Sequence, residues 1–142
     1  MLELSRTLRD RLAELAALDH PGEACGVLFG RRGPAGAWAV RLERLTNLAR
    51  PRSLASYEVH PGELVSAERA ARAAGLELLG FWHTHPDGTA LPSARDRREA
   101  WPDATYLIAA TARGRLRELR AWRLERGGAP CVDARMREEE LV

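Results

Sequence analysis

The stretch F-W-H-T-H-P-D-G-T-A-L-P-S-A-R-D, residues 81–96, carries the strongest information about this chain. The apolar run over residues 76–82 predicts a buried strand that leads directly into His83. Because residues i and i+2 of an extended chain face the same side, His83 and His85 can point to one place. Imidazole is the commonest neutral ligand of metals in proteins, and a catalytic zinc takes three protein ligands and keeps a fourth position open. The pair therefore predicts part of a metal site.

Asp96 is the candidate for the third ligand. Residues 87–92 predict a loop that turns the chain back, and Pro92 places Ser93 at the start of a short helix. Ser93 and Asp96 stand three apart on that helix and share a face, so both can point at the metal. Two other interpretations stay open, because S-x-x-D is also a helix cap and H-x-H is also a polar strand end. Asp87 is a rival ligand, although turn chemistry explains its P-D-G context.

A hydrolytic zinc site also needs a general base, which takes a proton from water and later gives it to the leaving group. The chain has fourteen glutamates, and residue types alone do not choose among them. Glu23 is the first candidate because it adjoins the apolar run A-C-G-V-L-F, where a carboxylate would be partly desolvated and held rigidly. Glu58, between Tyr57 and Val59, is the second.

The remaining pattern predicts helices and strands in alternation, and hence a mixed α and β fold. Leucines at helical spacing predict an amphipathic helix over residues 4–18, which His20-Pro21-Gly22 ends. Further helices are expected over residues 62–74 and 93–100. Strands are expected over residues 24–29, 38–48, 57–59, 76–82, 106–111 and 116–124, with a loop at 50–53 and a charged tail over about 127–142 that ends in a helix.

Length and composition point to one ordinary globular domain over residues 1–142. Apolar residues make up 45% of the chain and charged residues 30%. No apolar run reaches the length of a membrane span, and the N-terminus lacks the apolar core of a signal peptide. We therefore expect a cytoplasmic protein without a membrane partner.

Charge and cysteine content narrow the class further. The net charge is +2, and all 22 basic residues are arginines, most of which alternate with acids. Such a pattern is typical of a solvated surface, so we expect no nucleic-acid partner. Cys25 and Cys131 lie far apart and form no metal-binding motif, so both are expected to be thiols.

Taken together, these residues resemble the JAMM or MPN+ zinc metallopeptidases, also called the Mov34/MPN/PAD-1 family, in their compact bacterial form. The family pattern is an upstream glutamate, then H-[S/T]-H-P, then S-x-x-D after seven residues counted from that proline. Glu23 opens G-E-A-C-G-V-L-F-G, residues 83–86 give H-T-H-P, and residues 93–96 give S-A-R-D. The resemblance spans about residues 1–125, and no functional position departs from the pattern.

The resemblance implies a role for each matching residue. His83, His85 and Asp96 would hold one Zn²⁺ per chain, Glu23 would be the general base, and Ser93 would donate to the oxygen of the scissile carbonyl. It also implies an MPN-type domain with a curved central sheet flanked by helices, similar in architecture to cytidine deaminases. Members of the family often dimerise, so a homodimer is an open expectation.

The resemblance also implies an activity on peptide or isopeptide bonds. Many members cut after the C-terminal glycines of ubiquitin-like proteins, and some compact bacterial members act on ubiquitin-fold sulfur carriers. This chain lacks the insertions of the larger deubiquitinases, so trimming of a sulfur carrier is the first expectation. The alternative is a non-catalytic MPN scaffold or protein-interaction module, although scaffolds usually lose a ligand. Hydrolases of cell-wall or phage-tail peptides would normally bring a second catalytic domain or an export signal. Members of the DNA-repair branch usually carry asparagine between the histidines and an extra helical region, so Thr84 and the short length fit that branch less well.

Several residues near the motifs keep two interpretations. Thr84 is either a support for the site or a purely structural residue. Cys25 shares strand parity with Glu23 and could approach the site, but a small buried thiol is the favoured interpretation. His60 is expected at the surface, and Trp101 is expected to pack, with the wall of the cleft as its alternative.

Overall fold

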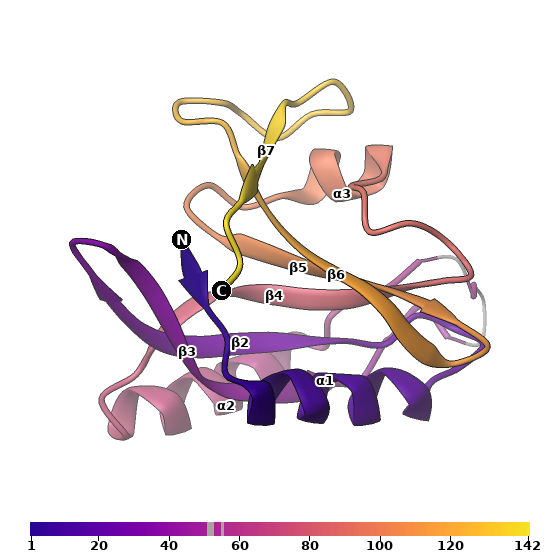
Figure 1. Cartoon of the computed structure of the whole chain (residues 1–142), viewed down its shortest axis with the longest axis horizontal. Helices are drawn as coiled ribbons and strands as arrows, with labels where there is room; N and C mark the ends of the chain where they lie inside the picture. Colours follow the sequence, from indigo (N-terminus) through magenta and orange to yellow (C-terminus); the bar gives the residue numbers. More distant parts are fainter. Residues whose placement is uncertain (51–52, 55) are drawn as a thin grey trace.

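The protein is described here by a computed structural model that covers residues 1–50, 53–54 and 56–142. Within this part of the chain a single sheet has the strand order β1-β3-β2-β4-β5-β6-β7. The strands are β1 (Leu2–Glu3), β2 (Cys25–Gly33), β3 (Gly36–Leu45), β4 (Glu77–Pro86), β5 (Thr105–Ala112), β6 (Arg115–Leu124) and β7 (Met136–Glu139). The helices are α1 (Arg6–Leu18), α2 (Pro61–Ala73) and α3 (Ala94–Glu99). Figure 1 shows the curved sheet and its helices, and the predicted mixed class is confirmed.

The two long helices cover opposite faces of the sheet. Because successive residues of a strand point to opposite faces, neighbouring residues of β4 belong to two different cores. Leu12 of α1 belongs to a core that includes Leu28 of β2 and Trp82 of β4. Ala71 of α2 belongs to a second core, which includes Phe81 of β4. His83 has the parity of Phe81, so it lies on the α2 face of the sheet.

Strand β4 and its connection to β5 bring the decisive stretch together. The predicted strand ended at residue 82, before both histidines. In the structure the strand continues to Pro86, so both histidines lie inside it. β4 pairs with β5 in parallel, and α3 lies in the crossover between them. On its other side β4 pairs antiparallel with β2, where His83 is opposite Cys25. The segment just before β2 is therefore brought beside the histidines.

The charged tail does not end in a helix, and that prediction is wrong. Residues 136–139 form β7, which pairs antiparallel with β6. Its charges are matched across the strands, since the Arg120 guanidinium donates to both Glu138 carboxylate oxygens at 2.6 and 2.8 Å. Beyond β7, Leu141 forms a parallel bridge with Leu2, and the Leu4 N–H donates to the Val142 carbonyl at 2.8 Å. The two ends of the chain thus lie side by side, as Figure 1 shows.

Two smaller expectations also differ from the structure. β3 ends at Leu45 and not at residue 48, and residues 57–59 form only one bridge, between Val59 and Asn47. The expected loop at 50–53 includes Pro51 and Arg52, which lie outside the described residues. None of the described helices has the length and apolar character needed to cross a membrane.

Candidate metal centre

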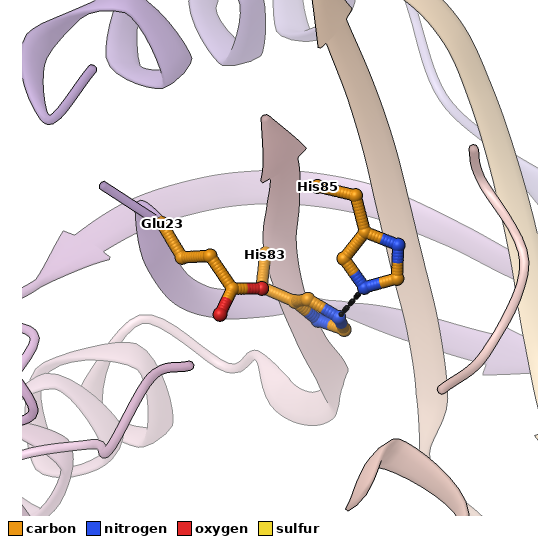
Figure 2. A group of neighbouring side chains, drawn as sticks. All are labelled: Glu23, His83 and His85. Carbon is orange, nitrogen blue, oxygen red and sulfur yellow. Dashed lines mark hydrogen bonds between the residues drawn. The ribbon is translucent and has the colours of Figure 1, made fainter. Parts of the chain in front are cut away.

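His83 and His85 converge as the strand geometry requires. Both rings project from the same face of β4, and their Nε2 atoms lie 3.1 Å apart (Figure 2). His83 is fully buried, and Tyr57 stacks on its ring at a centroid distance of 4.5 Å. His85 is partly exposed, and its Nδ1 lies 2.7 Å from the Thr89 carbonyl oxygen, which fixes the direction of Nε2. Two ring nitrogens therefore face one point.

Asp96 is brought to the same point from α3. Its Oδ1 lies 3.2 Å from His83 Nε2, and its Oδ2 lies 3.2 Å from His85 Nε2. Burial by itself would raise the pKa of Asp96, but hydrogen bonds from both imidazoles outweigh it and hold that pKa below its usual value. Asp96 is thus an ionised carboxylate between two imidazoles. The rival, Asp87, accepts the Arg113 N–H at 3.3 Å and occupies a turn with φ 53°.

Ser93 and Asp96 also form the helix cap that was weighed as an alternative. Ser93 Oγ accepts the Asp96 N–H at 3.1 Å, and Asp96 Oδ2 accepts the Ser93 N–H at 2.8 Å. This reciprocal pair is a capping box at the start of α3. The cap and the cluster are compatible, because the capping bond orients the carboxylate toward the histidines.

Glu23 completes the group from the segment before β2. One of its carboxylate oxygens lies within 4.8 Å of ring nitrogens of His83 and His85 (Figure 2). The side chain is 5% exposed, and its Oε2 has no hydrogen-bond partner among the described residues. Burial raises the pKa of Glu23 from 4.5 to about 7. Glu58, the other candidate base, is outside this group and lines a neighbouring cavity.

The donor set fits a zinc ion. Ligands about 2.0–2.1 Å from a tetrahedral zinc stand about 3.3 Å from one another. Here the nitrogen–nitrogen distance is 3.1 Å, and each nitrogen is 3.2 Å from an Asp96 oxygen. Two imidazoles and one carboxylate are ligands that zinc takes in catalytic sites. The buried Oε2 of Glu23, which lacks a partner among the described residues, is available to a water molecule beside these donors.

A cavity of about 420 Å³ gives access to the group. Its walls include Glu23, Tyr57, His85, Ser93, Arg95 and Asp96. A second cavity of about 490 Å³ shares Tyr57 and Arg95 with the first and is lined by Trp101. Trp101 is 50% exposed, and its ring meets the Phe81 ring edge-on with the ring centroids 4.9 Å apart. Trp101 therefore both packs against the core and lines a cavity.

The structure decides the residues that kept two interpretations. Thr84 Oγ1 accepts the Ala24 N–H at 2.9 Å, so Thr84 supports the backbone next to Glu23. Cys25 points into the core on the α2 face, and burial raises the pKa of its thiol to about 12. His60 is a helix cap, since its Nδ1 accepts the Glu63 N–H at 3.2 Å.

Two residues of the site were missed by sequence reasoning. Tyr57 stacks on His83, although it was noted only as a neighbour of Glu58. Asn47 lies behind Glu23 and donates to its carbonyl oxygen. One feature of the sequence could have drawn attention to it, because Asn47 is the only asparagine in the chain and there is no glutamine.

Comparison with known proteins defines the class. Residues 5–125 match the family model Prok-JAB, described as prokaryotic homologs of the JAB domain. The chain therefore belongs to this family, and the predicted compact JAMM/MPN class is confirmed.

Particular relatives agree with this class. The desampylase of Haloferax volcanii is 39% identical over 112 residues, which cover 75% of this chain and 78% of the relative. The CysO-cysteine peptidase of Mycobacterium tuberculosis is 34% identical over 131 residues, 89% of this chain and 85% of the relative. The solution structure of protein DSY2949 from Desulfitobacterium hafniense is similar with a TM-score of 0.84 and 30% identity, and covers 100% of this chain and 92% of that one. The chain is thus a JAMM-type hydrolase by family.

Proposed function

We propose that this protein is a zinc-dependent peptidase that hydrolyses the peptide or isopeptide bond after the C-terminal Gly-Gly of a ubiquitin-like protein or ubiquitin-fold sulfur carrier. The family and the names of the relatives, a desampylase and a CysO-cysteine peptidase, support the substrate class. The observation that carries the proposal is the convergence of His83, His85, Asp96 and Glu23, three of which line one cavity while His83 lies buried behind it. A cytoplasmic location and a homodimeric state stay predictions.

His83 and His85, through Nε2, and Asp96, through its carboxylate, would hold the zinc ion. When bound, zinc supplies Lewis-acid activation of water at neutral pH. The protein's contribution is rigidity: β4 fixes both histidines, and the capping box fixes Asp96. A site held by regular elements keeps its geometry through the reaction, which favours catalysis.

Glu23 would act as general base and then as general acid. Its Oε2 accepts a proton from the attacking water and passes it to the leaving nitrogen. A pKa raised to about 7 by burial suits this exchange, since a base works best when its pKa lies near the working pH. With no partner for Oε2 among the described residues, the oxygen does not have to break a protein hydrogen bond first.

Ser93 would stabilise the negative charge that develops on the scissile carbonyl oxygen. Its Oγ accepts the Asp96 N–H, so the hydroxyl hydrogen stays available for donation into the cavity. The loss of one such donor typically costs about 3–4 kcal/mol in barrier height. A Gly-Gly tail suits the site because it can approach in an extended form without side chains.

A fusion protein tests the proposal directly. The substrate is a ubiquitin-like carrier joined through Gly-Gly to a second peptide, and mass spectrometry identifies the products. We expect cleavage after the second glycine, loss of cleavage with a chelator, and recovery with added zinc. Glu23→Gln should keep the metal and lose most of the activity, while Glu77→Gln, an exposed glutamate at the start of β4, should cleave like the wild type. A zinc-loaded protein that leaves every such fusion intact would disprove the proposed function.

A further inference from the structure

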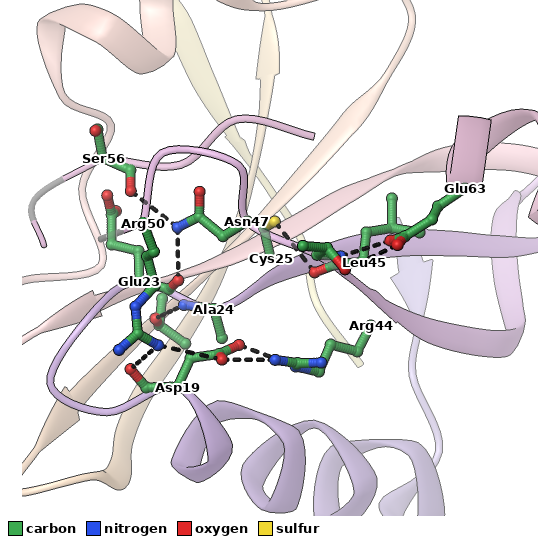
Figure 3. Close-up of polar contacts among 12 residues, drawn as sticks. Asp19, Glu23, Ala24, Cys25, Arg44, Leu45, Asn47, Arg50, Ser56 and Glu63 are labelled. Carbon is green, nitrogen blue, oxygen red and sulfur yellow. Dashed lines mark hydrogen bonds and ion pairs between the residues drawn. The ribbon is translucent and has the colours of Figure 1, made fainter. Parts of the chain in front are cut away.

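Asn47 is a buried polar residue, 6% exposed, and its side chain makes four hydrogen bonds to backbone groups. Nδ2 donates to the Glu23 carbonyl at 2.9 Å and to the Ser56 carbonyl at 3.0 Å (Figure 3). Oδ1 accepts the N–H groups of Ala49 and Glu58, both at 2.9 Å. A carboxamide has two donor hydrogens and two acceptor lone pairs, so this side chain uses its full capacity. Such a residue connects segments that the sheet alone does not join.

The first connected segment carries Glu23. Its Oε2 has no hydrogen-bond partner among the described residues, so the position of the carboxylate depends strongly on the backbone. That backbone is held on both sides. Asn47 binds the Glu23 carbonyl, and Thr84 exchanges two hydrogen bonds with Ala24, through Oγ1 at 2.9 Å and through its backbone N–H at 3.0 Å. Thr84 lies between the two histidines of the site, so this clamp relates Glu23 directly to them.

The second connected segment carries Tyr57. Asn47 binds the carbonyl of Ser56 and the N–H of Glu58, which are the two residues next to Tyr57 in the chain. The Tyr57 ring stacks on the buried His83 ring, with an interplanar angle of 25°. Together with the backbone hydrogen bond from the Leu48 N–H to the Glu58 carbonyl at 2.8 Å, Asn47 therefore holds the segment that carries the aromatic wall of His83, and it holds the segment of Glu23 as well.

We propose that Asn47 is a positioning residue that couples the base, Glu23, to the aromatic wall of the metal ligand, Tyr57 on His83. Asn47 does not need to touch substrate, since it acts through the two segments that it joins. This inference rests on the proposed function, because the positioning matters for catalysis only if Glu23 is the base. The coupling of the two segments, however, can be measured without any substrate.

Two substitutions separate the bonds of Asn47. Asn47→Ala removes all four, whereas Asn47→Asp has nearly the same shape and keeps the two acceptor bonds to Ala49 and Glu58. In Asn47→Asp a carboxylate oxygen faces the carbonyls of Glu23 and Ser56 at neutral pH, so the two hydrogen bonds that Nδ2 donates to these carbonyls are lost. Thr105→Val is the matched control, because it removes a buried hydrogen bond of 2.7 Å to Glu139, away from the site. If Asn47→Ala does not fold, Asn47→Asp supplies the same comparison.

The kinetic test is a double-mutant cycle with Glu23→Gln. Misplacement of a catalytic group by about 1 Å can cost about 100-fold in rate, so we expect kcat to fall by about that factor in both Asn47 variants, with a small change in KM. In the Glu23→Gln background the same variants should cost less than about threefold, because the base is already gone. An equal loss in both backgrounds, or a loss no larger than in Thr105→Val, would overturn the inference.

The substrate-free test is amide hydrogen exchange of the metal-free protein. In Asn47→Ala we expect the amides of Ala24 and Glu58 to lose protection together, and in Thr105→Val both should stay protected. Protection that changes at Glu58 alone would refute the coupling. A wild-type protein that cleaves no carrier but shows coupled exchange refutes the proposed function and leaves the coupling intact. A wild-type protein that cleaves, with uncoupled exchange, refutes this inference alone.

Discussion

The Asp96 carboxylate accepts the Ser93 N–H at 2.8 Å, and the Ser93 hydroxyl accepts the Asp96 N–H at 3.1 Å. The same Asp96 carboxylate faces both imidazoles. The start of α3 therefore serves two purposes at once. The capping box stabilises a helix of six residues, and it points the carboxylate toward the histidines. Substitutions at Ser93 can separate these purposes, because the cap and the hydroxyl donor depend on different properties of the residue.

Ser93→Ala and Ser93→Gly should lose similar amounts of activity but different amounts of stability. Both lack the hydroxyl that would stabilise the oxyanion, so kcat should fall by about 100–1,000-fold in each. Glycine replaces a capping serine at a cost of a few tenths of a kcal/mol, whereas alanine costs about 1 kcal/mol. Steady-state kinetics and urea unfolding measure the two effects. Recovery of activity in Ser93→Gly would show that Ser93 acts only as a cap.

Zinc should stabilise the folded protein, and His85→Ala should remove most of that stabilisation. A ligand that binds only the folded state at 100 times its Kd adds about 2.7 kcal/mol. Thermal unfolding with zinc and with a chelator measures the difference. His60→Ala is the control, because His60 caps α2 and lies outside the metal centre. It should lower the starting stability by about 1 kcal/mol and keep the full response to zinc. An undiminished response in His85→Ala would contradict the assigned ligands.

Glu23 should make the stability of the metal-free protein depend on pH. Because burial raises its pKa from 4.5 to about 7, folding favours the protonated form. The contribution is fully present below pH 4.5 and is lost as the pH rises to about 7. Relative to Glu23→Gln, the wild type should therefore lose about 3 kcal/mol over this range, since each pKa unit corresponds to about 1.4 kcal/mol.

Urea unfolding at pH 4.5 and pH 8 with a chelator checks this difference at both ends of the range. Glu77→Gln is the control, because it removes an exposed ion pair with Arg32 at 2.9 Å, and such pairs contribute about 0–1 kcal/mol. The burial argument would be wrong if the wild type and Glu23→Gln kept the same difference at both pH values.

The two cysteines should react very differently with thiol reagents. Cys131 is exposed, whereas Cys25 is buried and its pKa is raised to about 12, so Cys25 stays a neutral thiol in the folded state. A disulfide-exchange reagent should modify one thiol per chain in the native protein and two after denaturation. Cys131→Ser should show no fast reaction until it unfolds. Rapid modification of Cys25 in the native state would place it near solvent.

Sequence reasoning predicted the centre of the fold well because the relevant patterns are local. The apolar run before His83 specified a buried strand, and the i, i+2 spacing specified that both rings share a face. The S-x-x-D spacing specified a helix start. These spacings placed both imidazoles on one side of the chain and Asp96 on a short helix, although the predicted strand ended at residue 82. The structure extends β4 through both histidines and brings the three side chains together.

Long-range pairing was harder to predict from the sequence. To choose between Glu23 and Glu58 as the base, one must know which carboxylate is buried beside β4, and the sequence does not show this. The role of Asn47 depends on partners 9, 11 and 24 residues away, and a single polar residue creates no periodic pattern. The charged tail was expected to end in a helix, because the pairing of Glu138 with Arg120 is visible only once β7 is in register with β6.

Anomalous diffraction from crystals of the zinc-loaded protein tests the central claim most directly. Four residues from three separate segments are claimed to meet around one zinc ion. We predict a single strong zinc peak per chain, about 2.0–2.2 Å from His83 Nε2, His85 Nε2 and an Asp96 oxygen, with the Glu23 carboxylate near the ion but not bound to it. A zinc peak elsewhere in the molecule, or an Asp96 carboxylate turned away from the two imidazoles, would contradict the account.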